Sequence, residues 1–346
     1  MTIGKRASPC RPEIGAPADG ATILLLVSNG RLGYRVLRCL AALPGQVSRI
    51  VVLGSRNESS WPTRGLAGSR YCTAWIEAEW GYRDPRTAEQ INRIAADHLN
   101  LRVFAADMLT TEFLARFGDA IECAVCPSPS ADALARVARK DDFARFCHDG
   151  AIPHPPTVVA SDLDEAKRLV AARPADQRLV LKPLNGQGSA GVRVVEAGRP
   201  DWEAIDYAPI LIQDFVPGSD LCAAAFCHGG RVTTFQAYRH VHRPILGRMV
   251  NVGIEFFADP EFCDLVGKAT RRIGFEGLVS FDARRTAAGG LVLIECNPRA
   301  WFTMHLAMLA GINFASLAVG VTEGRFSAVN TFLRVVPGGV LAPDGK

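Results

Sequence analysis

Two acidic residues and one amide in the stretch 281–300, FDARRTAAGGLVLIECNPRA, have the types and spacing of a metal-binding hairpin. Strand-like runs flank the turn Ala287–Gly290 on both sides. In a hairpin symmetric about that turn, Asp282 lies opposite Glu295, where two like charges destabilise a sheet unless a cation offsets their repulsion. Asn297 follows Glu295 by two residues and therefore shares its face. These three oxygen side chains predict a site for Mg²⁺ that bridges nucleotide phosphates.

Two arrangements without a metal are also compatible with these residues. A one-residue change of register would place Asp282 on the opposite face of the hairpin. The carboxylates could instead pair with nearby arginines, namely Arg284, Arg285 and Arg299. Arg299 follows Pro298, so we expect it to leave the strand and to reach a phosphate.

A glycine loop, GQGSAG at 186–191, follows Lys182 by four residues. Its GxGxxG text matches the dinucleotide fingerprint, but that fingerprint requires a helix after the loop. The β-branched run VRVV follows instead, so we expect a hairpin with the loop at its tip and Lys182 on the entering strand. Such a loop can close over phosphates with its backbone N–H groups, and a lysine adds a point charge. A surface hairpin with a solvated lysine is the alternative.

The composition is that of an ordinary globular chain. The chain has 346 residues, and at about 150 residues per domain this predicts two or three domains. The net charge of +4 gives no basic excess of the kind that nucleic-acid or polybasic membrane proteins carry. No apolar run reaches the length of about 20 residues that a bilayer-spanning helix needs. We therefore expect neither a nucleic-acid nor a membrane partner.

The cysteines do not form a disulfide framework, because the ten of them are scattered over the whole chain. Cys123 and Cys126 make the one close pair, a CxxC with no second pair and no nearby histidine pair. This pattern favours buried thiols over a zinc or redox site. We expect a reduced, cytoplasmic protein.

The elements that must position these residues begin with a parallel sheet. Residues 1–20 are rich in Pro, Gly and Ala and predict a flexible lead-in. Apolar runs at 21–27 and 49–55 flank a helical pattern, which predicts a βαβ unit. We expect irregular structure at 56–85 and an extended connection at 151–157. Further helices are predicted at 87–98, 110–117, 131–147, 162–172, 260–273 and 303–321, and further strands at 121–127, 178–183, 191–196, 208–216, 278–285 and 290–298.

Four motifs, in this order, resemble the ATP-grasp superfamily and in particular its carboxylate–amine ligases. They are RKDDFARFCHDGAIPHPPT at 139–157, LVLKPLNGQGSAGV at 179–192, LIQDFVPGSDL at 211–221 and LIECNPR at 293–299. The resemblance implies an ATP-grasp fold, of α/β and α+β class, with an N-terminal Rossmann-like pre-ATP-grasp domain. The expected parts are the lead-in at 1–20, the N-terminal α/β domain at 21–128, the central lid part at 129–207 and the C-terminal nucleotide- and metal-binding part at 208–346.

The resemblance also implies a role for each matching residue. The ATP phosphates would be held by Lys140, Lys182 and the loop residues Gly186, Gln187, Gly188 and Ser189. Adenine and ribose would be bound by Gln213, Asp214, Phe215, Val216 and Asp220. Two Mg²⁺ ions, with Mn²⁺ as a possible substitute, would be held by Asp282, Glu295 and Asn297. The catalytic residues would be Lys182, Arg299 and Arg284, with Arg299 stabilising the transferred phosphoryl group.

The implied reaction is ATP-dependent formation of an amide or peptide bond. ATP would activate a small carboxylate as an acyl phosphate, which an amine then attacks, releasing ADP and phosphate. The alternatives are a phosphotransferase that uses the same site, a non-catalytic ATP-binding protein and, on the GxGxxG text alone, a nicotinamide-dependent oxidoreductase. A homodimer is a further expectation from the resemblance.

Recognition of the carboxylate substrate is where the chain departs from the family pattern. Some members carry an arginine two residues before the first metal carboxylate, whereas this chain has Ser280 there and Arg284 two residues after it. The basic run YRHVHRPILGR at 238–248 offers candidates for an anionic substrate, namely Arg239, Arg243 and Arg248. The alternating residues His240 and His242 share the other strand face with Tyr238, and we interpret both histidines as ordinary strand positions.

Overall fold

The computed structural model describes residues 20–43, 45–55, 61–185, 190–245, 248–322, 334–336 and 339–341. The expected lead-in and the loop residues Gly186, Gln187, Gly188 and Ser189 lie outside the described residues. The side chains of Arg243 and Arg248 also lie outside them.

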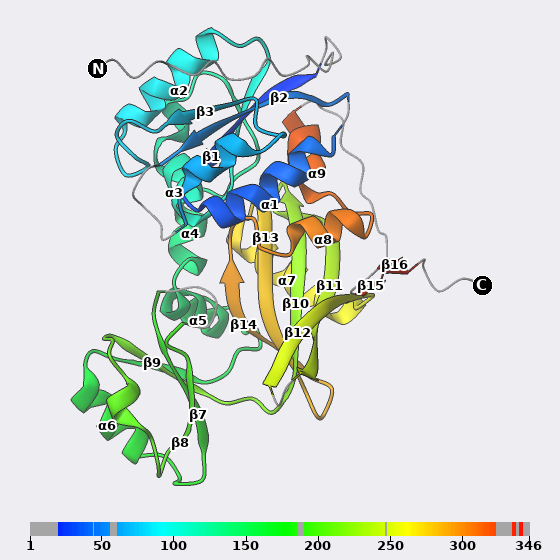
Figure 1. The fold of residues 1–346 in the computed structure, drawn as a ribbon. Helices are drawn as coiled ribbons and strands as arrows, with labels where there is room; N and C mark the ends of the chain where they lie inside the picture. The colour runs from blue at the N-terminus through cyan, green and yellow to red at the C-terminus, as the bar shows by residue number, and fades with distance from the viewer. Residues whose placement is uncertain are drawn as a thin grey trace, which may run out of the picture.

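The N-terminal sheet is parallel, with strand order β3-β2-β1-β4-β5 (Figure 1). Its strands are β1 (Ala21–Val27), β2 (Val47–Gly54), β3 (Ala74–Glu77), β4 (Leu101–Ala105) and β5 (Ala124–Val125). Every residue of β1 is buried, as a central strand of a parallel sheet covered on both faces requires. The helices α1 (Gly30–Ala41), α2 (Arg86–Ala96) and α3 (Met108–Phe117) and the short 3₁₀ turns Thr63–Gly68 and Gly118–Ala120 complete this layer. The predicted βαβ unit is confirmed, because β1 pairs with β2 in parallel across α1.

A four-stranded antiparallel sheet, with order β6-β9-β7-β8, forms a separate lobe. Its elements are β6 (Thr157–Ala160), α6 (Leu163–Ala171), β7 (Arg178–Pro183), β8 (Arg193–Glu196), the 3₁₀ turn Trp202–Ala204 and β9 (Ile210–Asp214). The strands β7 and β8 pair antiparallel around the glycine loop. The predicted hairpin is therefore confirmed, and the dinucleotide interpretation fails because a strand rather than a helix follows the loop.

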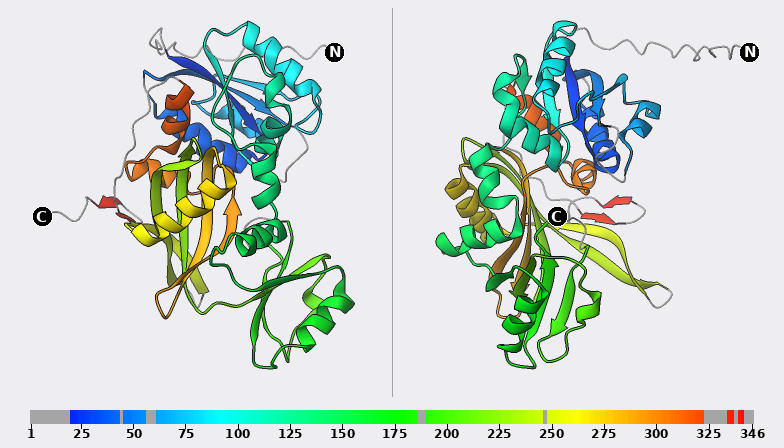
Figure 2. Two further views of the ribbon diagram at one scale, coloured as in Figure 1. Left: turned by 180° about the vertical axis from the view of Figure 1, so that it is seen from behind. Right: turned by 90° about the vertical axis from the view of Figure 1, so that its left-hand side faces the viewer.

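The largest sheet has the order β14-β13-β10-β11-β12-β15-β16. Its strands are β10 (Gly218–His228), β11 (Arg231–Ile245), β12 (Arg248–Phe257), β13 (Gly277–Thr286), β14 (Leu291–Asn297), β15 (Arg334–Val336) and β16 (Gly339–Leu341). Helix α7 (Pro260–Ile273) covers one face, and α8 (Met304–Leu309) and α9 (Phe314–Thr322) lie against the other (Figure 2). Strand β10 alternates accordingly: Ala223 and Ala225 join the core under α7, and Ala224 and Phe226 join the core under α8 and α9.

The helices α8 and α9 connect the largest sheet to the N-terminal sheet. Both contact α1, and the Asn313 side-chain amide donates to the Cys39 carbonyl at 2.8 Å. One apolar core runs from β1 and α1 through α8 and α9 to β10. The N-terminal part is therefore anchored on the sheet that carries the acidic hairpin. No helix among the described residues is long and apolar enough to cross a membrane.

Several sequence-based boundaries were wrong. The helix predicted at 131–147 is two helices, α4 (Ala131–Val137) and α5 (Lys140–Asp149), because Arg139 is extended and caps α5. The helix predicted at 303–321 is divided near Gly311, whose φ of +100° breaks it into α8 and α9. The stretch predicted to be irregular contains the edge strand β3, and the central strand β4 was not predicted.

Candidate active site

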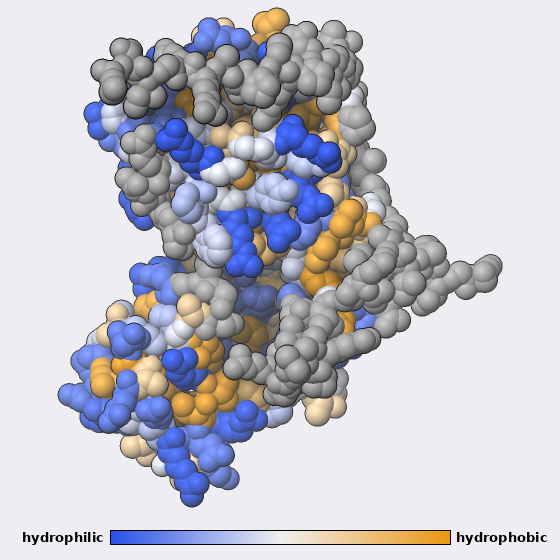
Figure 3. Space-filling model, viewed as in Figure 1, coloured by the Kyte–Doolittle hydropathy of each residue, from blue (hydrophilic) through white to orange (hydrophobic). Residues whose placement is uncertain are grey.

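A cleft of about 890 Å³ lies between the four-stranded lobe and the largest sheet. In the space-filling view the outline of the molecule is indented on the left, just above this lobe (Figure 3). The cleft brings together most of the predicted site residues, which come from five segments distant in sequence. Those that line it are Lys140, Lys182, Gln213, Asp214, Phe215, Val216, Asp220, Arg239, Asp282, Arg284, Glu295, Asn297 and Arg299.

The acidic pair stands opposed across β13 and β14, as the sequence predicted, but through an irregularity that the sequence did not reveal. Near the turn, Ala283 pairs with Leu293, so the hairpin is centred on Ala288. Ile294 is then an extra, unpaired residue, and Asp282 pairs with Glu295. The Leu293 N–H, next to the bulge, donates to the Pro153 carbonyl at 2.8 Å. The segment that follows α5 therefore helps to hold the bulge that places Glu295.

A row of directly paired residues runs across the strands β11, β10, β13 and β14 and includes the acidic pair. Tyr238 pairs with Cys222, Cys222 with Asp282, and Asp282 with Glu295. The Cys222 thiol lies 3.4 Å from the Asp282 Oδ1 atom and donates to it. Burial, followed by the nearby Glu295 carboxylate, raises the pKa of Asp282 to about 6. A cation bound beside Asp282 would stabilise its ionised form, which burial and the Glu295 carboxylate disfavour.

Asn297 links the acidic pair to Arg299. Its amide nitrogen donates to the Asp282 Oδ2 atom at 3.4 Å, and its oxygen accepts from the Arg299 guanidinium at 3.0 Å. The described residues contain no group of three or more His, Cys, Asp and Glu that could hold a metal by themselves. Two carboxylates and an amide fit Mg²⁺, which takes one or two protein carboxylates and completes its octahedron with phosphate oxygens and water. Ligation by Asn297 would use the amide oxygen that also accepts from Arg299.

Two lysines face the acidic pair from different elements. Lys140 opens α5, and its Nζ atom lies 3.5 Å from the Glu295 Oε1 atom. Lys182 comes from β7, is only 4% exposed, and donates to the Gln213 Oε1 atom at 3.1 Å. Burial lowers the pKa of Lys182 to about 8, although the Glu295 carboxylate acts in the opposite direction. The cleft therefore holds cations and carboxylates side by side, as a site for a metal–phosphate complex requires.

The segment after β9 carries an aromatic ring between two guanidinium groups. The Phe215 ring centroid lies 3.8 Å from the Arg178 guanidinium carbon and 5.0 Å from that of Arg284. Arg284 also donates to the Gly218 carbonyl at 2.6 Å and lies 3.5 Å from the largely exposed Asp220 carboxylate. The structure therefore places Arg284 beside the predicted nucleotide-binding segment, with its guanidinium anchored there.

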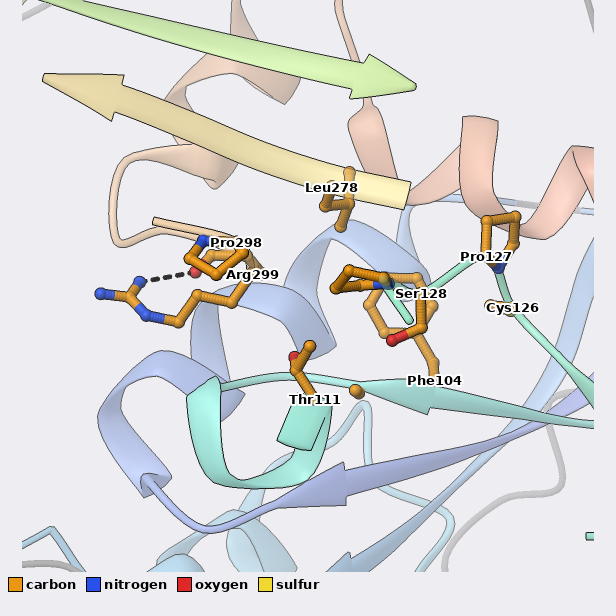
Figure 4. Close-up of a pocket in the computed structure, with 11 residues that line it drawn as sticks. Phe104, Thr111, Cys126, Pro127, Ser128, Leu278, Pro298 and Arg299 are labelled. Carbon is orange, nitrogen blue, oxygen red and sulfur yellow. Dashed lines mark hydrogen bonds between the residues drawn. The ribbon is translucent and has the colours of Figure 1, made fainter. Parts of the chain in front are cut away.

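Arg299 is buried at the end of β14. It is 8% exposed, and it donates to its own neighbour's carbonyl, that of Ala300, at 2.8 Å. Burial lowers its pKa, against the opposing effect of the Asp107, Glu295 and Asp282 carboxylates. A cavity of about 20 Å³ adjoins it, and the guanidinium points away from Ser128 on the cavity's other side (Figure 4). That volume suits one water molecule.

The basic run on β11 divides between two faces. Arg239 pairs with Glu255 on the neighbouring strand at 2.7 Å, so its charge is already balanced where it borders the cleft. Tyr238, His240 and His242 share the opposite face of the strand and also line the cleft, with neighbouring rings about 6 Å apart. The strand alternation in the sequence already indicated this shared face. No sequence signal marked three further lining residues, Trp301, Phe302 and Thr303.

Residues 138–302 match the family model of an ATP-grasp domain. Among solved structures, the chain is similar to N5-carboxyaminoimidazole synthetase from Staphylococcus aureus complexed with ADP, with 14% identity, a TM-score of 0.67, and 90% of this chain and 79% of that chain covered. It is similar to L-amino acid ligase from Bacillus licheniformis, with 14% identity, a TM-score of 0.64, and coverage of 90% and 77%.

A third similar structure is the biotin carboxylase domain of Hydrogenobacter thermophilus 2-oxoglutarate carboxylase, complexed with MgADP and bicarbonate. It has 17% identity, a TM-score of 0.63, and coverage of 90% of this chain and 71% of that chain. No curated protein matches the chain. These likenesses confirm the fold that the four sequence motifs predicted.

Proposed function

We propose, on the premise that residues 138–302 are an ATP-grasp domain, that this chain is an ATP-dependent ligase that joins a small carboxylate to an amine. One observation carries the proposal: the opposed carboxylates Asp282 and Glu295 share a cleft with Lys140, Lys182 and Arg299. The site has the charges to hold a metal–nucleotide complex. The similar structures that were solved with ADP support an adenine nucleotide as the ligand.

The reaction has two balanced steps. An oxygen of the substrate carboxylate attacks the γ-phosphorus of ATP, the bond from that phosphorus to the bridging oxygen of ADP breaks, and an acyl phosphate forms. The amine nitrogen then attacks the acyl carbon, phosphate leaves with its oxygen, and the nitrogen loses a proton. A carboxylate alone lacks a good leaving group, so the first step makes the second one feasible.

The protein contributes position and charge rather than a nucleophile. Lys140 and Lys182 would hold the phosphate oxygens, and Arg299 would stabilise the charge on the phosphoryl group in transfer. Asp282, Glu295 and Asn297 would hold the Mg²⁺ ions, two of them as the resemblance to the family implies. When bound, Mg²⁺ neutralises phosphate charge. The loop of the β7–β8 hairpin, with Gly186, Gln187, Gly188 and Ser189, would cover the phosphates and exclude water from the acyl phosphate.

The nucleotide base would lie against the segment Gln213–Val216, where Phe215 and Arg284 both line the cleft, with the guanidinium carbon 5.0 Å from the ring centroid. Asp220 would bind the ribose hydroxyls. The remaining end of the cleft carries Tyr238, His240 and His242 and would take the acceptor substrates. Arg239, Arg243 and Arg248 stay candidates for contact with an anionic group. The expected partition into parts 21–128, 129–207 and 208–346, the cytoplasmic location and a homodimer also belong to this proposal.

The experiment is a screen of amino acids and small carboxylates, each with and without amines, for ATP-dependent phosphate release. We expect release to require a carboxylate and an amine together. Lys182→Ala and Glu295→Ala should each lower the rate by about 100-fold, the size of effect seen when one group that stabilises transition-state charge is lost. Lys167→Ala and Glu276→Ala, which change exposed ion pairs far from the cleft, serve as matched controls.

The outcomes separate the candidate functions. If both site variants keep the full rate, the assigned site is wrong. If the acceptor accumulates as a stable phosphate ester or acyl phosphate whether or not an amine is present, the chain is a phosphotransferase. If MgATP binds but no acceptor gives turnover, the chain is a non-catalytic ATP-binding protein.

A further inference from the structure

A chain of hydrogen bonds, buried at Lys182 and Gln213 and partly buried beyond them, leads away from Lys182 and ends on one backbone carbonyl. The Lys182 ammonium donates to the Gln213 Oε1 atom at 3.1 Å. The Gln213 amide nitrogen lies 2.9 Å from the Thr157 hydroxyl and 3.4 Å from the His154 Nε2 atom. The Thr157 hydroxyl and the His154 Nδ1 atom each lie 2.8 Å from the Pro155 carbonyl.

Chemistry fixes the direction of every bond in this chain. A lysine ammonium only donates, so the Gln213 atom that faces it must be the amide oxygen. The amide nitrogen then faces Thr157 and His154 and needs two acceptors. The Pro155 carbonyl only accepts, so both the Thr157 O–H and the His154 Nδ1–H point to it. The oxygen of Thr157 and the Nε2 atom of His154 are left to accept from Gln213.

The network uses the neutral histidine with the proton on Nδ1. A protonated ring would present N–H toward the Gln213 amide nitrogen, and two donors would face each other. Burial lowers the pKa of His154 to about 4, so the ring stays neutral at neutral pH. Phe143 packs edge-on against it, with ring centroids 5.7 Å apart. Gln213 is 3% exposed, so water cannot replace a lost partner easily.

We propose that His154 and Thr157 are positioning residues that keep the Gln213 amide oxygen turned toward Lys182. With both acceptors in place, the amide cannot turn over without leaving two buried N–H groups unpaired. Without them it is free to turn and to present N–H to the ammonium, which would drive Lys182 from its place over the acidic pair. This inference rests on the proposed function, because it takes Lys182 as a phosphate contact.

The test measures the dissociation constant of a non-hydrolysable ATP analogue with Mg²⁺ by calorimetry. His154→Phe keeps the ring that packs on Phe143, and Thr157→Val keeps the shape of threonine. The double variant therefore removes the two acceptors of the Gln213 amide, together with the two donors to the Pro155 carbonyl. We expect it to weaken binding about tenfold, which corresponds to the loss of one hydrogen bond to a charged group. Thr157→Ser, which restores the hydroxyl in a conservative form, should bind like the wild type.

A double-mutant cycle with Lys182→Ala separates positioning from a general structural effect. In the Lys182→Ala background the double substitution should cause no further loss, because it acts through that lysine. The inference is overturned if the double variant binds like the wild type, or if its full tenfold loss adds to that of Lys182→Ala. If Lys182→Ala itself binds normally, the site assignment under the proposed function fails as well. Should the double variant not fold, Thr157→Val compared with Thr157→Ser decides, with about a threefold loss expected for valine alone.

Discussion

Asp282 and Glu295 face each other across β13 and β14 because Ile294 is an unpaired extra residue in β14. Without that bulge, the three-residue turn centred on Ala288 would set Ile294 opposite Asp282 and turn Glu295 to the other face. The two carboxylates are the feature on which the proposed metal–nucleotide site depends. Burial and this proximity raise the pKa of Asp282, and a bound divalent cation would offset the repulsion between the two carboxylates.

The first prediction concerns the dependence of nucleotide binding on magnesium. The wild type should bind ADP more tightly with Mg²⁺ than with a chelator, because the cation would neutralise charge on both the acidic pair and the phosphates. Glu295→Gln should remove most of this enhancement while leaving metal-free binding of ADP unchanged or slightly tighter. Calorimetric titrations with and without Mg²⁺ check this, with Glu276→Gln as the control. An unchanged enhancement in Glu295→Gln would contradict the assignment of the ligand.

The second prediction concerns pH and the stability of the metal-free protein. The pKa of Asp282 rises on folding from 3.8 to about 6, so the folded state binds more protons than the unfolded state between these values. The free energy of unfolding should therefore fall as pH rises through this window, by about 3 kcal/mol from this group. Asp282→Asn should be more stable than the wild type at pH 7.5, and the difference should shrink toward pH 4.

Chemical unfolding in the presence of a chelator measures this effect at both pH values. Addition of Mg²⁺ and ADP at pH 7.5 should stabilise the wild type more than Asp282→Asn, since only the wild type keeps the carboxylate. The prediction is contradicted if, at pH 7.5 and without metal, the wild type is more stable than Asp282→Asn. That result would show that burial does not disfavour the ionised Asp282 carboxylate.

The third prediction concerns Lys182. Its pKa of about 8 means that it loses its charge as pH rises from 7 to 9. Since the charged form attracts phosphates, the affinity for a non-hydrolysable ATP analogue should fall over this range. Lys182→Arg stays charged throughout, so any affinity that it retains should be nearly independent of pH. The comparison of the two pH profiles by calorimetry tests the claim, and parallel profiles would contradict it.

The fourth prediction concerns Gln236 on β11, which is fully buried and has no hydrogen-bond partner for either amide atom among the described residues. Gln236→Met keeps the volume and removes an unpaired amide, so the free energy of unfolding should rise by about 1–3 kcal/mol. The matched control is Gln90, which is also buried but bonds to the Glu77 carbonyl and the Glu79 N–H. Gln90→Met should destabilise the chain. Denaturant unfolding of the two variants gives the comparison, and a loss of stability in Gln236→Met would refute it.

Local patterns were sufficient for the parts of the site that lie on one element or one hairpin. The alternation in β13 and β14 predicted that Asp282 and Glu295 share a face, and VRVV after the glycine loop predicted a hairpin rather than a helix. The prediction for the acidic pair rested on a symmetric turn, whereas the real turn is shorter. It succeeded because the bulge at Ile294 restores the pairing. Next to that bulge the Leu293 N–H donates to the Pro153 carbonyl, which is distant in the sequence.

Features set by tertiary contacts were not predictable from the sequence. The run from Ala131 to Cys147 is rich in Ala and Arg and contains no Gly or Pro, yet the chain is extended at Arg139 so that Lys140 begins a new helix beside Glu295. The break at Gly311 did have a signal in the glycine itself. Both His154 and Thr157 lie within the motif at 139–157, but their contacts with Gln213 arise only when the segment after α5 meets β9.

The most direct test of the proposed ligase uses a carboxylate substrate labelled with ¹⁸O in both carboxyl oxygens, chosen from the phosphate-release screen. If an acyl phosphate forms and an amine displaces the phosphate, one ¹⁸O atom must leave with phosphate for each amide formed. Mass spectrometry of the released phosphate should show one label per phosphate, and Glu295→Ala should abolish its appearance. Unlabelled phosphate released together with the amide product would contradict the proposed mechanism.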